Sequence, residues 1–139
     1  MNGAAQRKPP FQFQLDLSTG VPVYRQIIDQ VLLGIATGAL SGGDQLPTVR
    51  QLAVDLSINP NTVIRAYREL EIRGVLTTQQ GTGTFIMPGT VQPDDAERQR
   101  RLNQLVGEFA ARAGREGFTV QDLIDRLVEL QLETERRGR

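Results

Sequence analysis

The chain has 139 residues, enough for one or two small domains, and 39% of them are hydrophobic, as in ordinary globular proteins. Its 16 basic and 16 acidic residues cancel, whereas a domain that binds nucleic acid commonly carries a basic surplus. Cys and His are both absent, which excludes thiolate metal sites and removes the usual general base, so we expect no metal, no cofactor and no enzymatic activity.

The N-terminal part predicts a loose segment followed by a helix. Residues 1–10 show no periodicity and end in a proline pair, which is typical of a disordered arm. FQFQLDL alternates apolar and polar residues and predicts a short extended segment. Pro22 is expected at the first helical position and Gly38 at the helix end. Between them, apolar residues recur at helical spacing: Tyr24, Ile27, Ile28, Val31, Leu32 and Ile35.

Two shorter helices follow a loop that begins at Leu40. Thr48 and Gln51 have the spacing of a capping box, which predicts a second helix through about Leu56. Ser57 and Ile58 form the turn after it. Its inner face is predicted to hold Leu52, Ala53 and Leu56.

The third helix has clear signals at both ends. Asn59 is a good N-cap, Pro60 takes the first helical position, and Gly74 ends the helix. The predicted inward residues are Val63, Ala66, Tyr67 and Leu70. The predicted outward residues are Asn61, Thr62, Arg65, Arg68 and Glu69.

A hairpin and a helical tail complete the chain. Residues 75–78 and 84–86 read as strands joined by a turn at Gly81, Thr82 and Gly83. The tail has one apolar stripe over Leu102, Leu105, Val106, Phe109, Ala110 and Ala113, which Gly114 and Gly117 are expected to interrupt. Thr119 and Asp122 are expected to cap a final helix with a stripe over Val120, Leu123, Ile124, Leu127 and Val128.

These elements predict a mainly α fold with a small β-hairpin wing. We expect a disordered arm over residues 1–10, a winged helix-turn-helix domain over 11–88, a linker over 89–95 and a helical dimerisation domain over 96–137. Such a winged domain binds double-stranded DNA by placing its recognition helix in a groove. Residues 50–68 hold three arginines and one acid, so this face is basic although the chain is neutral.

Short polar side chains open the expected recognition helix. Asn59, Asn61 and Thr62 suit the approach to base edges, and unpaired N–H groups at the helix start are expected to bind a phosphate oxygen. Arg65 reaches either a guanine or a phosphate, and Arg50 is expected to contact the DNA backbone or a base edge. The alternative is that Asn59 and Thr62 only cap the helix and that the wing glycines only form a turn.

The run from Leu46 to Phe85 resembles the winged domain of GntR-family transcription regulators. Its NPNTV, RAY, ELE and GTGTF segments, followed by a short tail, are similar to the YtrA-type branch. The resemblance implies a repressor. It also implies DNA contacts by Arg50, by Asn59, Pro60, Asn61, Thr62 and Arg65, and by the wing at Gly81, Thr82 and Gly83. Many relatives have Ser-Arg where this chain has Asn59–Pro60, so their base preference does not transfer.

The tail predicts self-association. Two amphipathic helices cannot bury both broad stripes on each other, so apolar area should remain exposed. A two-fold homodimer would cover it, through Leu102, Leu105, Phe109, Leu123, Ile124 and Leu127. The alternative is that the tail packs within one chain. The RQRR run at residues 98–101 is expected to be a solvated face balanced by Asp94, Asp95 and Glu97.

We therefore expect a homodimeric, sequence-specific DNA-binding regulator acting on an inverted-repeat operator. No run of about eighteen apolar residues occurs and no signal-peptide core is present, so we expect a cytoplasmic protein without a membrane partner. The alternative function is a winged-helix protein–protein interaction module without operator binding, which the neutral charge favours. Nothing in the sequence marks a small-molecule effector site.

Overall fold

A computed structural model describes residues 11–89 and 94–137. Within it the chain divides into two compact units, with the boundary after Pro88. The expected disordered arm lies outside the described residues, as does most of the expected linker. No helix in the described ranges is both long and apolar enough to cross a membrane.

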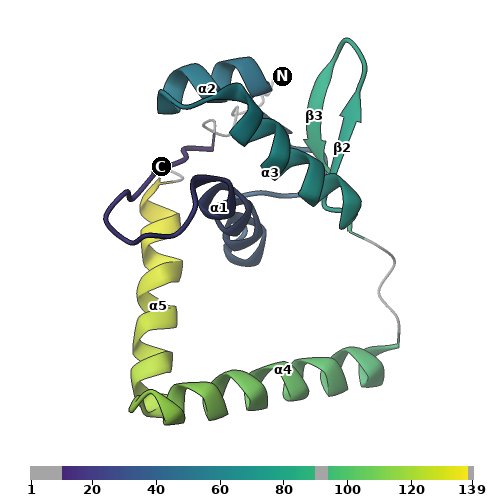
Figure 1. Ribbon diagram of the computed structural model, residues 1–139. Coiled ribbons are helices and arrows are strands. Elements are labelled where there is room, and N and C mark those ends of the chain that lie inside the picture. Colours follow the sequence, from purple (N-terminus) through teal and green to yellow (C-terminus); the bar gives the residue numbers. More distant parts are fainter. Residues whose placement is uncertain (1–10, 90–93, 138–139) are drawn as a thin grey trace. The chain divides into compact units, whose positions relative to one another are not determined.

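The first unit contains three helices and a three-stranded antiparallel sheet (Figure 1). The helices are α1 (Val23–Thr37), α2 (Val49–Leu56) and α3 (Pro60–Ile72). The strands are β1 (Gln45–Leu46), β2 (Leu76–Gln79) and β3 (Gly83–Ile86), and they lie in the order β1-β3-β2. This architecture is the predicted winged helix-turn-helix, with β1 as an element that the sequence did not predict.

One hydrophobic core joins these elements. The most deeply buried side chains come from α1 and α3, where Ile27, Val31, Val63 and Leu70 are fully covered. Apolar residues from α2 and the strands complete the core: Leu46, Leu52, Ala53, Leu76 and Ile86. Ile35 was expected on the inner face of α1 but is 39% exposed, because it lies in the last turn of the helix, beyond the core.

The segment before α1 is held by side chains instead of a strand partner. Phe13 is buried in the core, and its ring meets that of Phe11 edge to face at 5.0 Å. The Gln26 side chain accepts from the Asp16 N–H at 2.9 Å and donates to the Asp16 carbonyl at 2.9 Å. Pro22 is the N-cap of α1 and not its first residue, since its ψ of 142° is extended.

Local capping fixes the helix-turn-helix. The Thr48 hydroxyl accepts from the Gln51 N–H at 3.1 Å, as predicted, but the Gln51 amide turns away to Asp55 and leaves the capping box half formed. Tyr67 of α3 donates to the Pro47 carbonyl at 2.8 Å, which ties α3 to the residue before α2. Burial raises the pKa of the Tyr67 hydroxyl, so this donor keeps its proton.

The second unit consists of α4 (Asp95–Arg115) and α5 (Val120–Arg137), which diverge from a tight turn (Figure 1). Helix α4 begins at Asp95, one residue inside the expected linker, because Asp94 caps it. Gly114 was expected to interrupt the helix but is helical, and the left-handed residue at the turn is Gly117, with a φ of 91°. Thr119 and Asp122 cap α5 reciprocally, as predicted.

The apolar stripes of this unit are largely exposed. Ala113, at the turn, is its one buried hydrophobic residue among those described. The exposed side chains include Leu102, Leu105, Val106, Phe109, Ile124, Leu127 and Val128. The prediction that uncovered apolar area would remain is therefore confirmed for the single chain.

Candidate nucleic-acid interface

Helix α3 has a sharply divided surface. Its predicted inner residues are all buried, with Val63, Ala66 and Leu70 at 0% exposure. Asn61, Arg65 and Arg68 are exposed on the opposite side, as predicted. The expected recognition helix therefore presents its polar face to solvent.

The start of α3 has no free backbone donor for a phosphate in its first three positions. Pro60 has no N–H, the Asn61 N–H donates to the Asn59 side chain at 2.8 Å, and the Thr62 N–H donates to the Asn59 carbonyl at 3.0 Å. The expected phosphate site on these N–H groups is therefore wrong. Asn59 acts as the helix cap, which leaves its amide NH₂ for any contact outside the protein.

Free backbone donors lie instead at the start of α2. Thr48 binds the N–H groups of Gln51 and Leu52, whereas those of Val49 and Arg50 have no acceptor among the described residues. The Arg50 side chain lies in the same turn and is exposed. The positive end of the helix dipole and a guanidinium thus coincide, as suits an anion.

Arg65 is positioned by an aromatic ring. Its guanidinium carbon lies 3.8 Å from the centre of the Tyr24 ring, and Tyr24 belongs to the first turn of α1. Stacking of this kind orients the group without neutralising its charge. From the sequence, Tyr24 was expected only in the apolar stripe of α1, and its spacing gave no sign of this contact.

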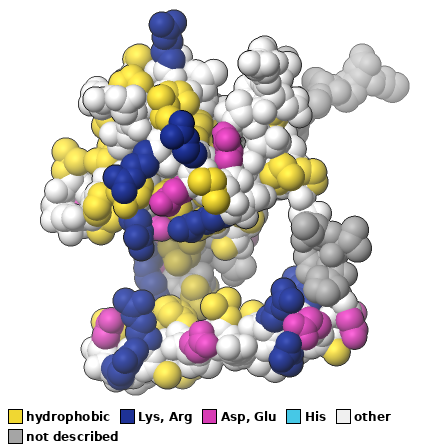
Figure 2. Space-filling model, turned by 45° about the vertical axis from the view of Figure 1, so that its right-hand side comes forward, with side chains coloured by type: hydrophobic (Ala, Val, Ile, Leu, Met, Phe, Trp, Pro, Cys, Tyr) yellow, Lys and Arg dark blue, Asp and Glu magenta, His cyan; other side chains and the backbone are white. Residues whose placement is uncertain are grey.

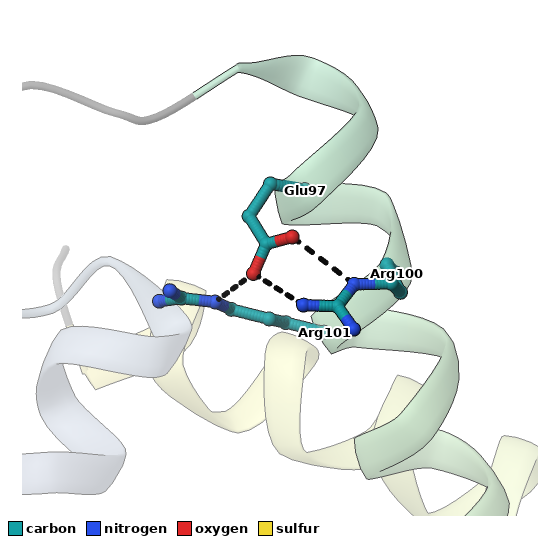
Figure 3. A network of polar contacts seen from close by, with 3 residues as sticks. All are labelled: Glu97, Arg100 and Arg101. Atoms are coloured by element: carbon teal, nitrogen blue, oxygen red, sulfur yellow. Dashed lines mark hydrogen bonds and ion pairs between the residues drawn. The ribbon is translucent and has the colours of Figure 1, made fainter.

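The arginines of the two units differ in their partners. In the second unit Glu97 accepts from Arg100 at 3.0 and 2.8 Å and from Arg101 at 3.0 Å (Figure 3). These bonds, those to Arg100 first, hold the pKa of Glu97 below its ordinary value. The expected balance between the RQRR run and a neighbouring acid is thus confirmed for Glu97.

In the first unit, Arg73 pairs with Glu69 at 3.7 Å. Within residues 11–89, by contrast, no acid forms an ion pair with Arg25, Arg50, Arg65 or Arg68. Figure 2 shows basic side chains among hydrophobic and some acidic ones on a face of this unit, and basic beside acidic side chains along α4. Four arginines of the first unit thus have no ion-pair partner among residues 11–89, although this range has no surplus of basic over acidic residues.

The wing is a short hairpin with a tight tip. The Thr82 N–H donates to the Gln79 carbonyl at 3.0 Å, and Gly81 has a φ of 82°, which suits the third position of a type II turn. Gln79 pairs with Gly83, so Gly83 belongs to β3 and not to the turn in which it was predicted. At the base of the hairpin, the Thr78 hydroxyl donates to the Glu71 carboxylate of α3.

Gln45 is a wing residue that the sequence analysis missed. Its side-chain amide donates to the Thr82 carbonyl at 3.1 Å. In doing so the side chain passes directly over the backbone of Gly83. A Cβ atom at Gly83 would lie 2.5 Å from the Gln45 Nε2 atom, so the contact depends on this glycine. The one sign of this contact in the sequence is the glycine at position 83, where a larger residue would collide with the Gln45 side chain.

The described residues contain no cluster of acidic side chains that could hold a metal ion. The features gathered on the first unit are instead cations, helix starts and an exposed hairpin. Such groups suit phosphates and base edges.

Comparison with known proteins agrees with this geometry. The profile of the bacterial regulatory proteins of the gntR family matches residues 23–86. A Mycobacterium tuberculosis HTH-type transcriptional regulator, Rv1152, is 42% identical over 94 residues, which cover 68% of this chain and 76% of that protein. The Bacillus subtilis HTH-type transcriptional repressor YtrA is 45% identical over 73 residues, covering 52% of this chain and 56% of that repressor.

A solved structure shows the same architecture. It is that of YtrA from Sulfolobus acidocaldarius, a GntR-family transcription factor, with a TM-score of 0.52 and 31% identity. The alignment covers 71% of this chain and 97% of that one. These similar proteins are transcription regulators and not enzymes.

Proposed function

Because the chain belongs to the gntR family of bacterial regulatory proteins and resembles its YtrA-type members, we propose that it is a homodimeric repressor that binds an inverted-repeat operator. The observation that carries this proposal is the group of arginines on the winged unit that have no ion-pair partner. Arg50, Arg65 and Arg68 remain without acidic partners in the described structure, while Arg100, Arg101 and Arg126 are paired. A polyanion would supply the missing counter-charge.

We assign the roles at the protein–DNA interface by chemistry. Asn61 and Thr62, in the exposed first turn of α3, are the base-reading candidates, since a side-chain amide can bind an adenine edge with two hydrogen bonds. Arg50 and the free N–H groups at the start of α2 bind a phosphate. Gly81 to Gly83 bring the wing backbone close to the neighbouring groove, with Thr82 at the tip.

The homodimer rests on the exposed stripes of the second unit. Leu102, Leu105 and Phe109 on α4, with Ile124 and Leu127 on α5, are each about half exposed in the single chain. Leu123 lies in the same stripe of α5. Large exposed apolar surfaces are typical of association sites. A second copy of the chain, related by a two-fold axis, is the simplest partner that would cover them. Two winged units in one dimer would bind half-sites about one DNA turn apart.

The repressor role comes from the Bacillus subtilis relative, which is named a repressor. Its action on chromosomal DNA would place the protein in the cytoplasm. Nothing in the described residues assigns an effector.

Selection of bound sequences from random duplexes, followed by footprinting, tests the proposal. We expect an inverted repeat to be enriched and its affinity to fall steeply with salt. Asn61→Ala should weaken operator binding by about 1–3 kcal/mol if it reads a base. Arg112→Ala is the matched control, because Arg112 pairs with Glu116 at 3.6 Å in the second unit.

The contrary result would be equal binding of all duplexes and no protected site at moderate salt. Together with a stable complex with another protein, that result would favour the protein–protein interaction module.

A further inference from the structure

Helix α3 carries two large apolar side chains outside its buried face, Ile64 in its second turn and Ile72 at its end. Ile64 is 38% exposed, whereas the adjacent inner residues Val63 and Ala66 are at 0%. The sequence analysis assigned Ile64 to neither face. It therefore lies at the edge of the buried face of α3, with about two-fifths of its surface open to solvent.

The neighbours of Ile64 along the helix include two of the expected DNA contacts and an exposed arginine. Pro60 and Asn61 precede it by one turn, and Arg68 follows it by one turn, at the i−4, i−3 and i+4 spacings that place side chains beside each other. Arg65 adjoins it in sequence and is drawn toward Tyr24 of α1. An apolar group thus lies among polar and cationic side chains, in the second turn of the recognition helix.

The chemistry of a DNA groove restricts what such a group can contact. An isoleucine side chain neither donates nor accepts a hydrogen bond, so it gains nothing from phosphates or from the polar edges of bases. The apolar group that the major groove offers is the C5 methyl of thymine. Contact with that methyl would remove apolar surface from water on both partners.

We propose that Ile64 is a specificity residue that recognises a thymine methyl group in each operator half-site. The proposal rests on the proposed function, since it assumes that α3 enters the major groove. It adds a base preference that hydrogen-bonding residues do not provide. The Asn59 side chain already caps α3, so fewer polar groups remain to read this part of the site.

This assignment is tested by combining a substitution in the protein, Ile64→Ala, with removal of single thymine methyl groups from the DNA. The selected operator is prepared with deoxyuridine in place of each thymine in turn, which removes only the methyl group. Wild-type protein should lose about three- to tenfold in affinity at one thymine per half-site, the scale of one buried methyl or slightly more. Ile64→Ala should bind the unmodified operator more weakly by a similar factor and should be insensitive to uracil at that position.

Ile72→Ala is the matched control. Ile72 is the same residue type on the same helix, is 79% exposed and lies about two turns further from the helix start. It should respond to every uracil replacement as the wild type does. Because alanine is a good helix former and Ile64 is partly exposed, the Ile64→Ala variant should stay folded with only a modest fall in unfolding temperature.

The outcomes separate the two proposals. If wild type and Ile64→Ala bind one operator and respond equally to every uracil replacement, Ile64 does not read a methyl group, while operator binding stands. If neither protein selects any sequence, the proposed function fails, and the role of Ile64 fails with it.

Discussion

At the scale of single residues, Arg65 is the clearest case of a side chain whose role depends on its surroundings. The stack on Tyr24 holds its guanidinium against the first turn of α1. A cation held beside a helix of the scaffold suits a backbone phosphate better than a guanine edge deep in the groove. Of the two contacts that the sequence left open for Arg65, we favour the phosphate.

The first prediction follows from this choice. Arg65→Ala should weaken binding to the operator and to random duplex by the same factor and should lower the salt slope by about 1. Tyr24→Phe should keep the aromatic face and wild-type affinity, whereas Tyr24→Ala should cost about 0.5–1 kcal/mol of binding. Titrations at several salt concentrations measure all three. Loss of discrimination at one base pair in Arg65→Ala would show a base contact instead.

At the scale of elements, the wing depends on a strand of two residues. β1 pairs Gln45 with Phe85 and Leu46 with Thr84, which buries Leu46 in the core and points Gln45 toward the hairpin tip. The Gln45 amide then fixes the carbonyl of Thr82. Without the Gln45 bond, the hairpin tip would be fixed only by the hydrogen bonds within its own turn.

The second prediction concerns this brace. Gln45→Ala should weaken operator binding by about two- to tenfold, the worth of one net hydrogen bond, because the wing tip loses its fixed position. Its thermal unfolding temperature should change little, since Gln45 is exposed. Gln104→Ala, which removes another exposed amide that bonds Glu108 at 3.2 Å, is the control and should bind normally.

A second substitution makes the wing experiment sharper. Gly83→Ala should displace the Gln45 side chain and strain a backbone with a φ of 131°, so its binding defect should be at least that of Gln45→Ala. Wild-type affinity in both variants would contradict a role for the brace in binding.

At the scale of the whole molecule, the two units differ in the kind of surface that they expose. The winged unit has a complete core and exposed cations, whereas the helical unit pairs four of its arginines (Arg100, Arg101, Arg112 and Arg126) and exposes its apolar residues. In the proposed function the second unit supplies the dimer contact and the first unit supplies the DNA-binding surface.

The third prediction tests this division. Leu105→Asp places a charge on a side chain that is 64% exposed in the single chain and that the proposed dimer would bury. Sedimentation should show a monomer, and affinity for the full operator should fall to that for one half-site. Unfolding of the winged unit should be unchanged, because its core includes no residue of α4.

Ala111→Asp provides the control for charge and helix propensity. Ala111 is exposed on the side of α4 opposite the apolar stripe. This variant should remain dimeric and bind the full operator normally. A wild-type chain that sediments as a monomer at working concentrations would contradict the dimer itself.

The sequence by itself determined the helices of the winged unit, the N-caps Thr48 and Asn59, and most of the buried faces. Asn59, Pro60 and the 63-66-67-70 stripe predicted α3 to within a residue or two, because capping and periodicity act over three or four neighbouring positions. The capping pair of Thr119 and Asp122 was predicted for the same reason.

Only the tertiary structure decided which groups remain available for DNA. The stack of Arg65 on Tyr24 joins two helices, and the bond from Gln45 to Thr82 joins residues that are 37 apart in the chain. A strand as short as β1 has no periodicity to detect. Contacts between distant residues depend on how the core brings the elements together, and local sequence patterns do not carry that information.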